Sequence, residues 1–109
     1  MAPSLQTIRK RSKFLNVRDK GIFIKGKCLN IQFLEDESLK EVIAVGYTAT
    51  KKIGNAVKRN KAKRLMREVA RKVLRKYCKI NSYYVLIAKN SIFSTSFVAL
   101  EIELKNLIS

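Results

Sequence analysis

The chain has 109 residues, of which 24 are Lys or Arg, 8 are Asp or Glu and none is His, so its formal net charge is +16. This length leaves room for one domain with one core, and a 47% hydrophobic content excludes a chain that is disordered by composition. A charge of this size destabilises a compact state by self-repulsion, so we expect an anionic partner that neutralises it. The longest apolar runs, such as residues 42–47, are too short to cross a bilayer, which excludes a membrane-spanning segment.

The N-terminal sequence and the cysteines indicate the compartment. Residues 1–14, MAPSLQTIRKRSKF, contain no apolar h-region, so we expect a cytoplasmic protein. Their Ser and Arg content and their lack of acids leave a mitochondrial transit peptide as the alternative. Cys28 and Cys78 are not in a C-x-x-C motif, and without His they cannot build a usual zinc site. We expect both thiols to be buried and reduced.

The first half of the chain predicts one helix and three strands. Residues 5–17 mix apolar and basic side chains, which favours a short helix ending before Gly21. The segment GIFI is followed by a KGK turn and then by CLNIQFL, whose alternation predicts a half-buried strand with Leu29, Ile31 and Phe33 on one face. After the acidic loop EDES, the segment EVIAVGYTATKK predicts a third strand.

The second face of these strands carries small and polar residues: Asn30, Gln32, Ala44, Gly46, Thr48 and Thr50. Such side chains bury little apolar area and need hydrogen-bond partners. Alternation alone leaves two interpretations open, a polar trough that binds something and an ordinary solvated sheet face.

The second half predicts a long helix, a strand and a final helix. The long helix begins near Asn55, and its apolar residues follow a three-four spacing at Ala62, Leu65, Met66, Val69, Ala70, Val73, Leu74 and Tyr77. The run YYVLIAK predicts a buried strand. Ser94 or Thr95 caps the last helix, whose inward side chains are Phe97, Leu100, Leu104, Leu107 and Ile108. The order α β β β α β α is that of an α+β sandwich, and the general rule favours a right-handed crossover around the long helix.

No catalytic or metal-binding constellation is visible in the sequence. The chain has no His, and three of its acids share the loop at residues 35–37. Glu101 and Glu103 lie two apart on a helix and point in different directions, while Glu68 is expected to pair with neighbouring arginines. Neither cysteine has a base beside it. We therefore predict no catalytic residue and no metal ligand on this chain.

The polar side of the long helix carries a row of cations. Arg59, Lys63, Arg67 and Arg71 recur every fourth residue, and Asn60, Arg64 and Arg75 flank them. Only Glu68 is interleaved, so we interpret this side as a surface for a polyanion rather than an ordinary solvated face, and we expect it to be open to water. Just before the helix, Lys51, Lys52 and the free N–H groups of the first turn favour a phosphate, although Gly54 and Asn55 also read as a turn and N-cap.

These residues resemble the protein subunit of bacterial ribonuclease P. That family carries S-K-K-x-G-N-A-V-x-R-N-R-x-K-R-x-x-R-E, and residues 50–68 read TKKIGNAVKRNKAKRLMRE. Weaker similarity covers IRKRSKFLNV near the start and YYVLIAKNS in the last strand. The resemblance extends over nearly the whole chain.

The resemblance implies a single RNA-binding domain over residues 1–109. The expected fold is a two-layer α/β sandwich with a four-stranded sheet and a left-handed β-α-β crossover, like the second domain of a small-subunit ribosomal protein. The implied enzyme is an endoribonuclease that removes the 5′ leader of precursor tRNA. Its large RNA subunit performs the catalysis with Mg²⁺, and this chain is the accessory subunit. Neither DNA nor a membrane is an expected partner, and no oligomer is expected.

The resemblance also implies two groups of site residues. Arg59, Asn60, Lys61, Lys63, Arg64 and Arg67 would contact the catalytic RNA, and we add Lys51, Lys52 and Arg71 from the charge pattern. The leader cleft would contain Phe14, Asn30, Gln32, Thr48 and Thr50, with Arg18 beside them.

Four positions depart from the family pattern. Lys61 replaces the Arg that is usual at this position, so the side chain cannot form the two parallel hydrogen bonds of a guanidinium group. Thr50 replaces a frequent Ser. Arg18 and Gln32 stand where some members have aromatic residues, which favours hydrogen bonding and charge over base stacking.

Two other functions compete with this interpretation. A small basic ribosomal protein, or another protein that binds structured RNA, would show the same composition. A DNA-binding regulator would place the long helix in the major groove, but it needs a preceding helix and tight turn where this chain has a predicted strand.

Overall fold

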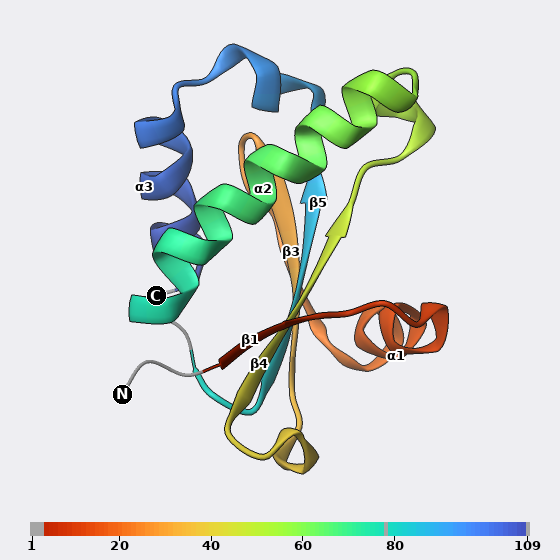
Figure 1. The fold of residues 1–109 in the computed structure, drawn as a ribbon, viewed down its shortest axis with the longest axis vertical. Helices are drawn as coiled ribbons and strands as arrows, with labels where there is room; N and C mark the ends of the chain where they lie inside the picture. Colours follow the sequence, from red (N-terminus) through yellow and green to blue (C-terminus); the bar gives the residue numbers. More distant parts are fainter. Residues whose placement is uncertain (1–3, 78, 109) are drawn as a thin grey trace.

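The computed structural model describes residues 4–77 and 79–108. Figure 1 shows the helices and strands, which are, in chain order, β1 (Ser4–Thr7), α1 (Arg11–Lys20), β2 (Ile22–Ile24), β3 (Leu29–Glu35), β4 (Val42–Thr48), α2 (Ala56–Tyr77), β5 (Ser82–Ala88) and α3 (Phe97–Ile108). Short 3₁₀ turns follow β3, β4 and β5, at Glu37–Leu39, Lys51–Ile53 and Asn90–Ser94.

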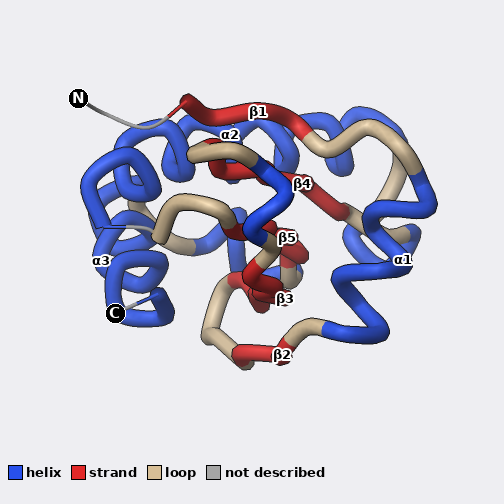
Figure 2. Tube along the Cα trace, turned by 90° about the horizontal axis from the view of Figure 1, so that it is seen from below, coloured by secondary structure: helices blue, strands red, loops and turns tan. Residues whose placement is uncertain are grey.

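The strands form one mixed sheet in the order β1-β4-β5-β3-β2. β4 is parallel to both of its neighbours, β1 and β5, whereas β3 is antiparallel to β5 and β2. Seen along the strands in Figure 2, α2 and α3 lie on one side of the sheet and α1 lies on the other. The chain leaves β4, returns through α2 and enters the adjacent β5 as a left-handed crossover (Figures 1 and 2). The mixed α+β class is confirmed, and the hand is the one that the resemblance implies.

The sheet has one strand more than predicted, because residues 4–7 are a strand and not the start of a helix. β1 pairs in parallel with the beginning of β4, and the N–H of Ile8 donates to the carbonyl of Val45 at 2.8 Å. The first helix begins only at Arg11 and runs on to Lys20. The spacing of Leu5 and Ile8 fits a helix as well as a strand. Pairing with β4 decides between them, and no local pattern reveals a partner almost forty residues away.

The main core lies between the sheet and the two helices α2 and α3. The apolar stripe of α2 supplies six buried residues, Ala62, Met66, Val69, Ala70, Val73 and Leu74, as its spacing predicts. Leu100 and Leu104 of α3 and the inward residues of β3 and β4 complete this core. The prediction for Tyr77 is wrong: the side chain is 47% exposed in the last turn of α2, where Lys105 Nζ lies 4.6 Å from its ring centroid.

The last helix begins slightly later than predicted. Ser96, rather than Ser94 or Thr95, caps α3, because its hydroxyl accepts the N–H of Ala99 at 3.1 Å. Ser94 ends the preceding 3₁₀ turn instead. Among the cysteines, Cys28 is buried with 4% exposure, as predicted, whereas Cys78 lies outside the described residues.

The second face of the sheet is neither a polar trough nor a solvated face over its whole length. Val17 of α1 packs there with Ile8, Ala44, Tyr83 and Val85 in a second, smaller core. The alternation of β3 and β4 could not show this, because the bulky apolar residues come from β5, which lies between those two strands. The part of this face at Gln32, Thr48 and Ile87 stays half-exposed and lines a cleft beside α1. None of the helices in the described ranges is long and apolar enough to cross a membrane.

Candidate nucleic-acid interface

Helix α2 presents cations along the side opposite its buried stripe. Its sequence is rich in Lys, Arg, Ala and Leu, which favour helix, and the side chain of Asn55 caps it by accepting the N–H of Lys58 at 3.0 Å. We call the predicted RNA-contact residues of this helix the ridge: Arg59, Asn60, Lys61, Lys63, Arg64, Arg67 and Arg71. All of them are exposed except Arg59 and Lys63, which are half-buried.

The expectation that the whole ridge is open to water is therefore wrong at two positions. Arg59 and Lys63 lie within a turn of Ala62 and Met66, so their stems border the core while most of the ridge faces away from it. The Nε atom of Arg59 is buried without a hydrogen-bond partner. Lys63 lines the cleft described below. Neither side chain is fully covered, so both remain part of the cationic surface.

Glu68, the one acidic residue of α2, forms no ion pair with the ridge. The expected pairing of Glu68 is wrong, because the ion pairs in the described part of the chain are Arg18–Asp19, Lys72–Glu101 and Lys79–Glu35. Like charges four residues apart cost a few tenths of a kcal/mol each in an isolated helix. The structure leaves this repulsion uncompensated, as expected of a surface that meets a polyanion.

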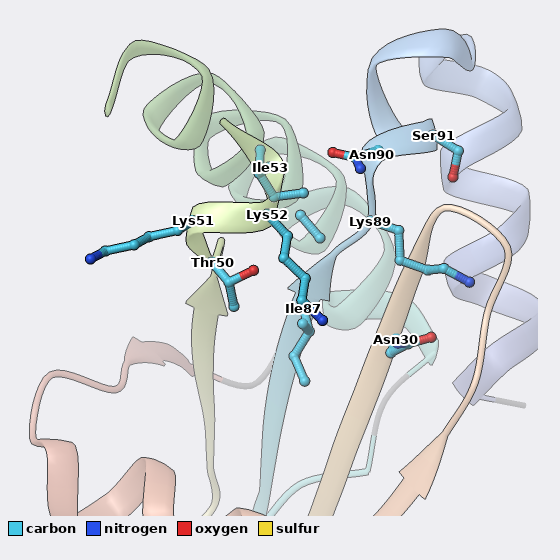
Figure 3. Close-up of a pocket in the computed structure, with 10 residues that line it drawn as sticks. Asn30, Thr50, Lys51, Lys52, Ile53, Ile87, Lys89, Asn90 and Ser91 are labelled. Atoms are coloured by element: carbon cyan, nitrogen blue, oxygen red, sulfur yellow. The ribbon is translucent and has the colours of Figure 1, made fainter. Parts of the chain in front are cut away.

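Lys51 and Lys52 lie in the 3₁₀ turn before α2. Gly54 links that turn to the helix. Its φ is 136°, a backbone conformation that residues other than glycine rarely adopt. Thr50, Lys52, Lys89 and Asn90 line a hollow of about 890 Å³ beyond the ends of β4 and β5. In Figure 3 the side chain of Lys52 extends over Ile87, whereas that of Lys51, which also lines the hollow, extends away from the other labelled side chains.

A cleft of about 670 Å³ lies between α1, the open part of the sheet and the start of α2. It brings together five of the six residues predicted for the leader cleft: Phe14, Arg18, Gln32, Thr48 and Thr50. The sixth, Asn30, lines the neighbouring hollow instead, where its side-chain oxygen accepts the N–H of Gly26 at 3.0 Å. Thr50 and Ile87 line both the cleft and the hollow, so the two adjoin each other along the sheet.

The cleft combines an apolar floor with a cationic rim. Val85 and Ile87 of β5 form the floor with Phe14, and Arg9, Arg11, Arg18 and Lys63 supply the charge. Phe14 reaches the floor because β4 has a glycine beneath it: a Cβ on Gly46 would lie 2.4 Å from Phe14 Cε1. An aromatic ring over a sheet with cations on both sides suits single-stranded nucleic acid, whose bases stack while its phosphates pair with the rim.

Tyr47 stands between the cleft and the ridge. Its ring lies 5.6 Å from the guanidinium carbon of Arg67, a cation–π distance. Burial raises the pKa of the Tyr47 hydroxyl, and the charges of Arg67 and Arg71 oppose that shift. The phenol therefore stays protonated near neutral pH and can donate a hydrogen bond.

Fold and surface together define the class: a small, basic α+β domain with a surface suited to a polyanion. The ribonuclease P family profile matches residues 2–109. The chain belongs to the family of ribonuclease P protein components.

Individual relatives agree with this assignment. The ribonuclease P protein component of Caulobacter vibrioides is 40% identical over 84 residues, which are 77% of this chain but only 56% of that relative. The protein component of Gluconacetobacter diazotrophicus is 36% identical over 92% of this chain and 85% of its own length. That of Geotalea uraniireducens is 35% identical over 97% and 90%.

Solved structures show the same fold. The RNase P protein from Thermotoga maritima superposes with a TM-score of 0.81 at 22% identity and covers 94% of both chains. The Staphylococcus aureus RNase P protein gives a TM-score of 0.77 at 23% identity, covering 93% of this chain and 90% of that one.

Several residues of the interface were not predicted from the sequence. Arg9 and Arg11 line the cleft because β1 is the edge strand of the sheet and the segment after it leads into α1, an arrangement that a continuous helix over residues 5–17 would not produce. Tyr47 also lines the cleft, although strand alternation places it on the same face of β4 as Ile43 and Val45. No pattern in the sequence distinguishes an arginine near a cleft from one in a solvated loop, so the only available signal was the local excess of charge.

Proposed function

We propose that this chain is the protein subunit of ribonuclease P. It binds the large catalytic RNA through the ridge on α2 and receives the 5′ leader of precursor tRNA in the cleft between α1 and the sheet. The chain thereby promotes endonucleolytic removal of the leader, which leaves the mature 5′ end. The observation that carries this proposal is a helix with one buried apolar stripe and one unpaired cationic side, in a chain of the ribonuclease P protein family.

The ridge recognises folded RNA mainly through phosphates. Arginine offers a planar fork for two parallel hydrogen bonds to a phosphate, and Arg59, Arg64 and Arg67 are spaced to contact neighbouring groups. Lys61 keeps the charge at its position but binds as a point charge. Lys51 and Lys52 add to the positive end of the α2 dipole, where a further phosphate is stabilised.

The cleft binds the leader as a single strand. Phe14 stacks on a base, while Gln32, Thr48 and Thr50 offer hydrogen bonds to base edges or to the sugar. Arg18 and the other cations of the rim hold the backbone. The adjoining hollow receives the strand past Thr50 and beside Lys52, so the leader and the catalytic RNA meet near the start of α2.

Mg²⁺ belongs to the RNA subunit in this proposal, and it supplies the Lewis-acid chemistry of phosphodiester hydrolysis there. Among the described residues, no group of three or more acidic or cysteine side chains is placed to hold a metal ion. Two carboxylates have partners within the protein: Glu103 accepts backbone N–H groups, and Glu101 forms an ion pair with Lys72. The protein's contribution is positioning and charge neutralisation. We place the subunit in the cytoplasm, where precursor tRNA would be available.

Reconstitution tests the proposal. The purified chain is mixed with a bacterial ribonuclease P RNA at low Mg²⁺, and cleavage of a precursor tRNA labelled at its 5′ end is followed. The expected result is a large increase in leader removal over RNA alone, with no cleavage by the protein alone. Cleavage without RNA, or no stimulation of the RNA at any protein concentration, would overturn the proposal.

A further inference from the structure

Helix α3 carries apolar side chains on its outer side as well as on its buried side. Leu100 and Leu104 pack into the main core, whereas Val98 is 64% exposed and Ile102 is 56% exposed. A surface helix usually carries polar or charged residues on the side that faces water. Val98 and Ile102 lie four residues apart, so they share one side of the helix. The outer side of α3 therefore presents an apolar stripe to water.

A groove of about 450 Å³ runs between this stripe and the last turns of α2. The two helices pack against each other on one side of the sheet (Figures 1 and 2). Val73 is buried at the bottom of the groove, while Tyr77 and Ile102 are exposed on its two walls. We call it the α2–α3 groove. It extends over roughly one and a half to two turns of each helix, which is the length of a short helical segment.

Lysines make the rim of the α2–α3 groove cationic. Lys72, Lys76 and Lys105 line it, and Glu101 is the one acid among the described residues that do so. Lys72 Nζ lies 3.7 Å from Glu101 Oε1, and Lys105 Nζ lies 4.6 Å from the ring centroid of Tyr77. Neither Lys76 nor Lys105 belongs to an ion pair of the described residues. Two ammonium groups beside exposed apolar side chains are thus available to carboxylates of another molecule.

The α2–α3 groove lies on a different flank of α2 from the ridge. Successive residues of an α-helix are about 100° apart, so Lys72 and Lys76 lie roughly 100° and 140° around the axis from Arg71. None of the residues that line the groove belongs to the ridge, to the leader cleft or to the hollow beside it. A molecule in the groove therefore does not displace RNA from the other surfaces.

The composition of the groove fits a protein partner better than RNA, a membrane or a second copy of the chain. Interfaces with nucleic acid are mostly polar, whereas protein interfaces have an apolar centre inside a polar rim. A membrane-surface helix needs a wide apolar face, but Leu100 and Leu104 of α3 point into the core instead. A second copy would bring another chain with a net charge of +16 against the lysines. Charge complementarity selects an acidic protein.

We propose that the α2–α3 groove binds a short, acidic, amphipathic helix of a protein partner. Apolar residues three and four positions apart on that helix would contact Val73, Tyr77 and Ile102. Its Asp or Glu side chains would pair with Lys76 and Lys105 at the rim. The partner would bind in addition to the RNA subunit and the precursor tRNA of the proposed function.

A synthetic peptide serves as the probe. It has about 18 residues, enough to form an isolated helix, with Leu along one side and Glu and Gln on the others. A second peptide has Gln in place of every Glu, which keeps the apolar side and removes the charge. The affinity of each labelled peptide for the whole chain is measured by fluorescence anisotropy at physiological salt, where charges more than about 8 Å apart are largely screened.

Two double variants with the same net charge locate the charged contacts. Lys76→Gln with Lys105→Gln removes two charges from the groove, and Arg64→Gln with Arg67→Gln removes two from the ridge. Gln has a helix propensity close to that of Lys and Arg, and circular dichroism checks the fold of each variant.

A second matched pair locates the apolar contact. Ile102→Gln removes an exposed apolar side chain from the groove, and Val57→Gln removes one from the first turn of α2. Gln favours helix more than Ile or Val does, so neither change should unfold its helix.

Both groove variants should bind the acidic peptide about 5-fold more weakly or worse, and both controls should stay within about 2-fold of the unaltered chain. Equal losses in the groove and ridge variants would overturn the inference, because only net charge would then matter. No binding of the acidic peptide to the unaltered chain, or equally tight binding of the uncharged peptide, would also overturn it.

The other occupants have their own signatures. If Lys76→Gln with Lys105→Gln weakened binding of the catalytic RNA as much as Arg64→Gln with Arg67→Gln does, the groove would belong to the RNA and the inference would fail. If the chain bound phosphatidylglycerol vesicles and Ile102→Gln released it, the groove would belong to a membrane and the inference would fail as well.

Discussion

Replacing Gly46 by Ala should damage the leader cleft without touching a charge. The added Cβ would lie 2.4 Å from Phe14 Cε1, 2.7 Å from Phe14 Cζ and 3.3 Å from Ile8 Cδ1. Ordinary carbon contacts begin near 3.5 Å, so the ring must retreat by about 1 Å, and Ile8 blocks part of the space behind it. Overpacking of this kind costs about 1–3 kcal/mol, and the half-buried ring can lower that cost by swinging into the cleft.

Displacement of the Phe14 ring should weaken leader binding by more free energy than it removes from the stability of the fold. Stacking of a base on an aromatic side chain contributes about 1–3 kcal/mol, so the affinity for precursor tRNA should fall between roughly 5-fold and 150-fold. The assay compares the reconstituted enzyme's dissociation constants for a precursor tRNA with its leader and for the same tRNA without one. Urea denaturation of the free protein and its affinity for the catalytic RNA serve as controls, and the second of these should not change.

A double-mutant cycle with Phe14→Ala decides whether Phe14 transmits the effect. Once the ring is gone, Gly46→Ala should have little further influence on leader affinity. Equal weakening by Gly46→Ala in the presence and absence of the ring would refute the reasoning, as would unchanged leader affinity in a variant whose stability had fallen by the expected amount.

Three further predictions follow from the two-sided helix and its surroundings. Met66→Ala, which leaves a cavity at a fully buried site, should lower the free energy of unfolding by about 2–5 kcal/mol in urea denaturation. Arg64→Ala should change the free energy of unfolding by no more than about 0.5 kcal/mol and should weaken RNA binding in a filter assay. Similar losses of stability in both variants would contradict the division of α2 into two sides. Glu103→Ala removes the carboxylate that accepts the N–H groups of Cys28 and Leu29, at 2.8 and 3.1 Å. This change should lower the free energy of unfolding by about 1–3 kcal/mol without changing RNA affinity. A variant as stable as the wild type would contradict this prediction. If about six phosphates are engaged, a plot of log affinity for the catalytic RNA against log salt should have a slope of roughly −4 to −5, and a slope near zero would show that binding does not depend on counterion release.

The amino-acid sequence determined the long helix and both of its sides. Periods of three and four residues place Met66 and Val69 inward and Arg67 and Arg71 outward whatever the helix packs against. The same holds for the inward faces of β3 and β4, whose alternation is a local property of the strand. Gln32 and Thr48 of the predicted leader cleft were found together because they share one sheet face, which alternation also reveals, whereas Phe14 and Arg18 reach the cleft from α1.

Only the tertiary structure decided the features that depend on a distant partner. Residues 4–7 form a strand because β4 offers a parallel edge, and the second sheet face is partly covered because Val85 of the intervening strand packs against α1. Asn30 lines the neighbouring hollow rather than the cleft itself, and its side-chain oxygen accepts the N–H of Gly26 there. A periodic pattern records which way a side chain faces on its own element. It does not record which element lies opposite, because that choice is made by hydrogen bonds and contacts between segments far apart in the chain.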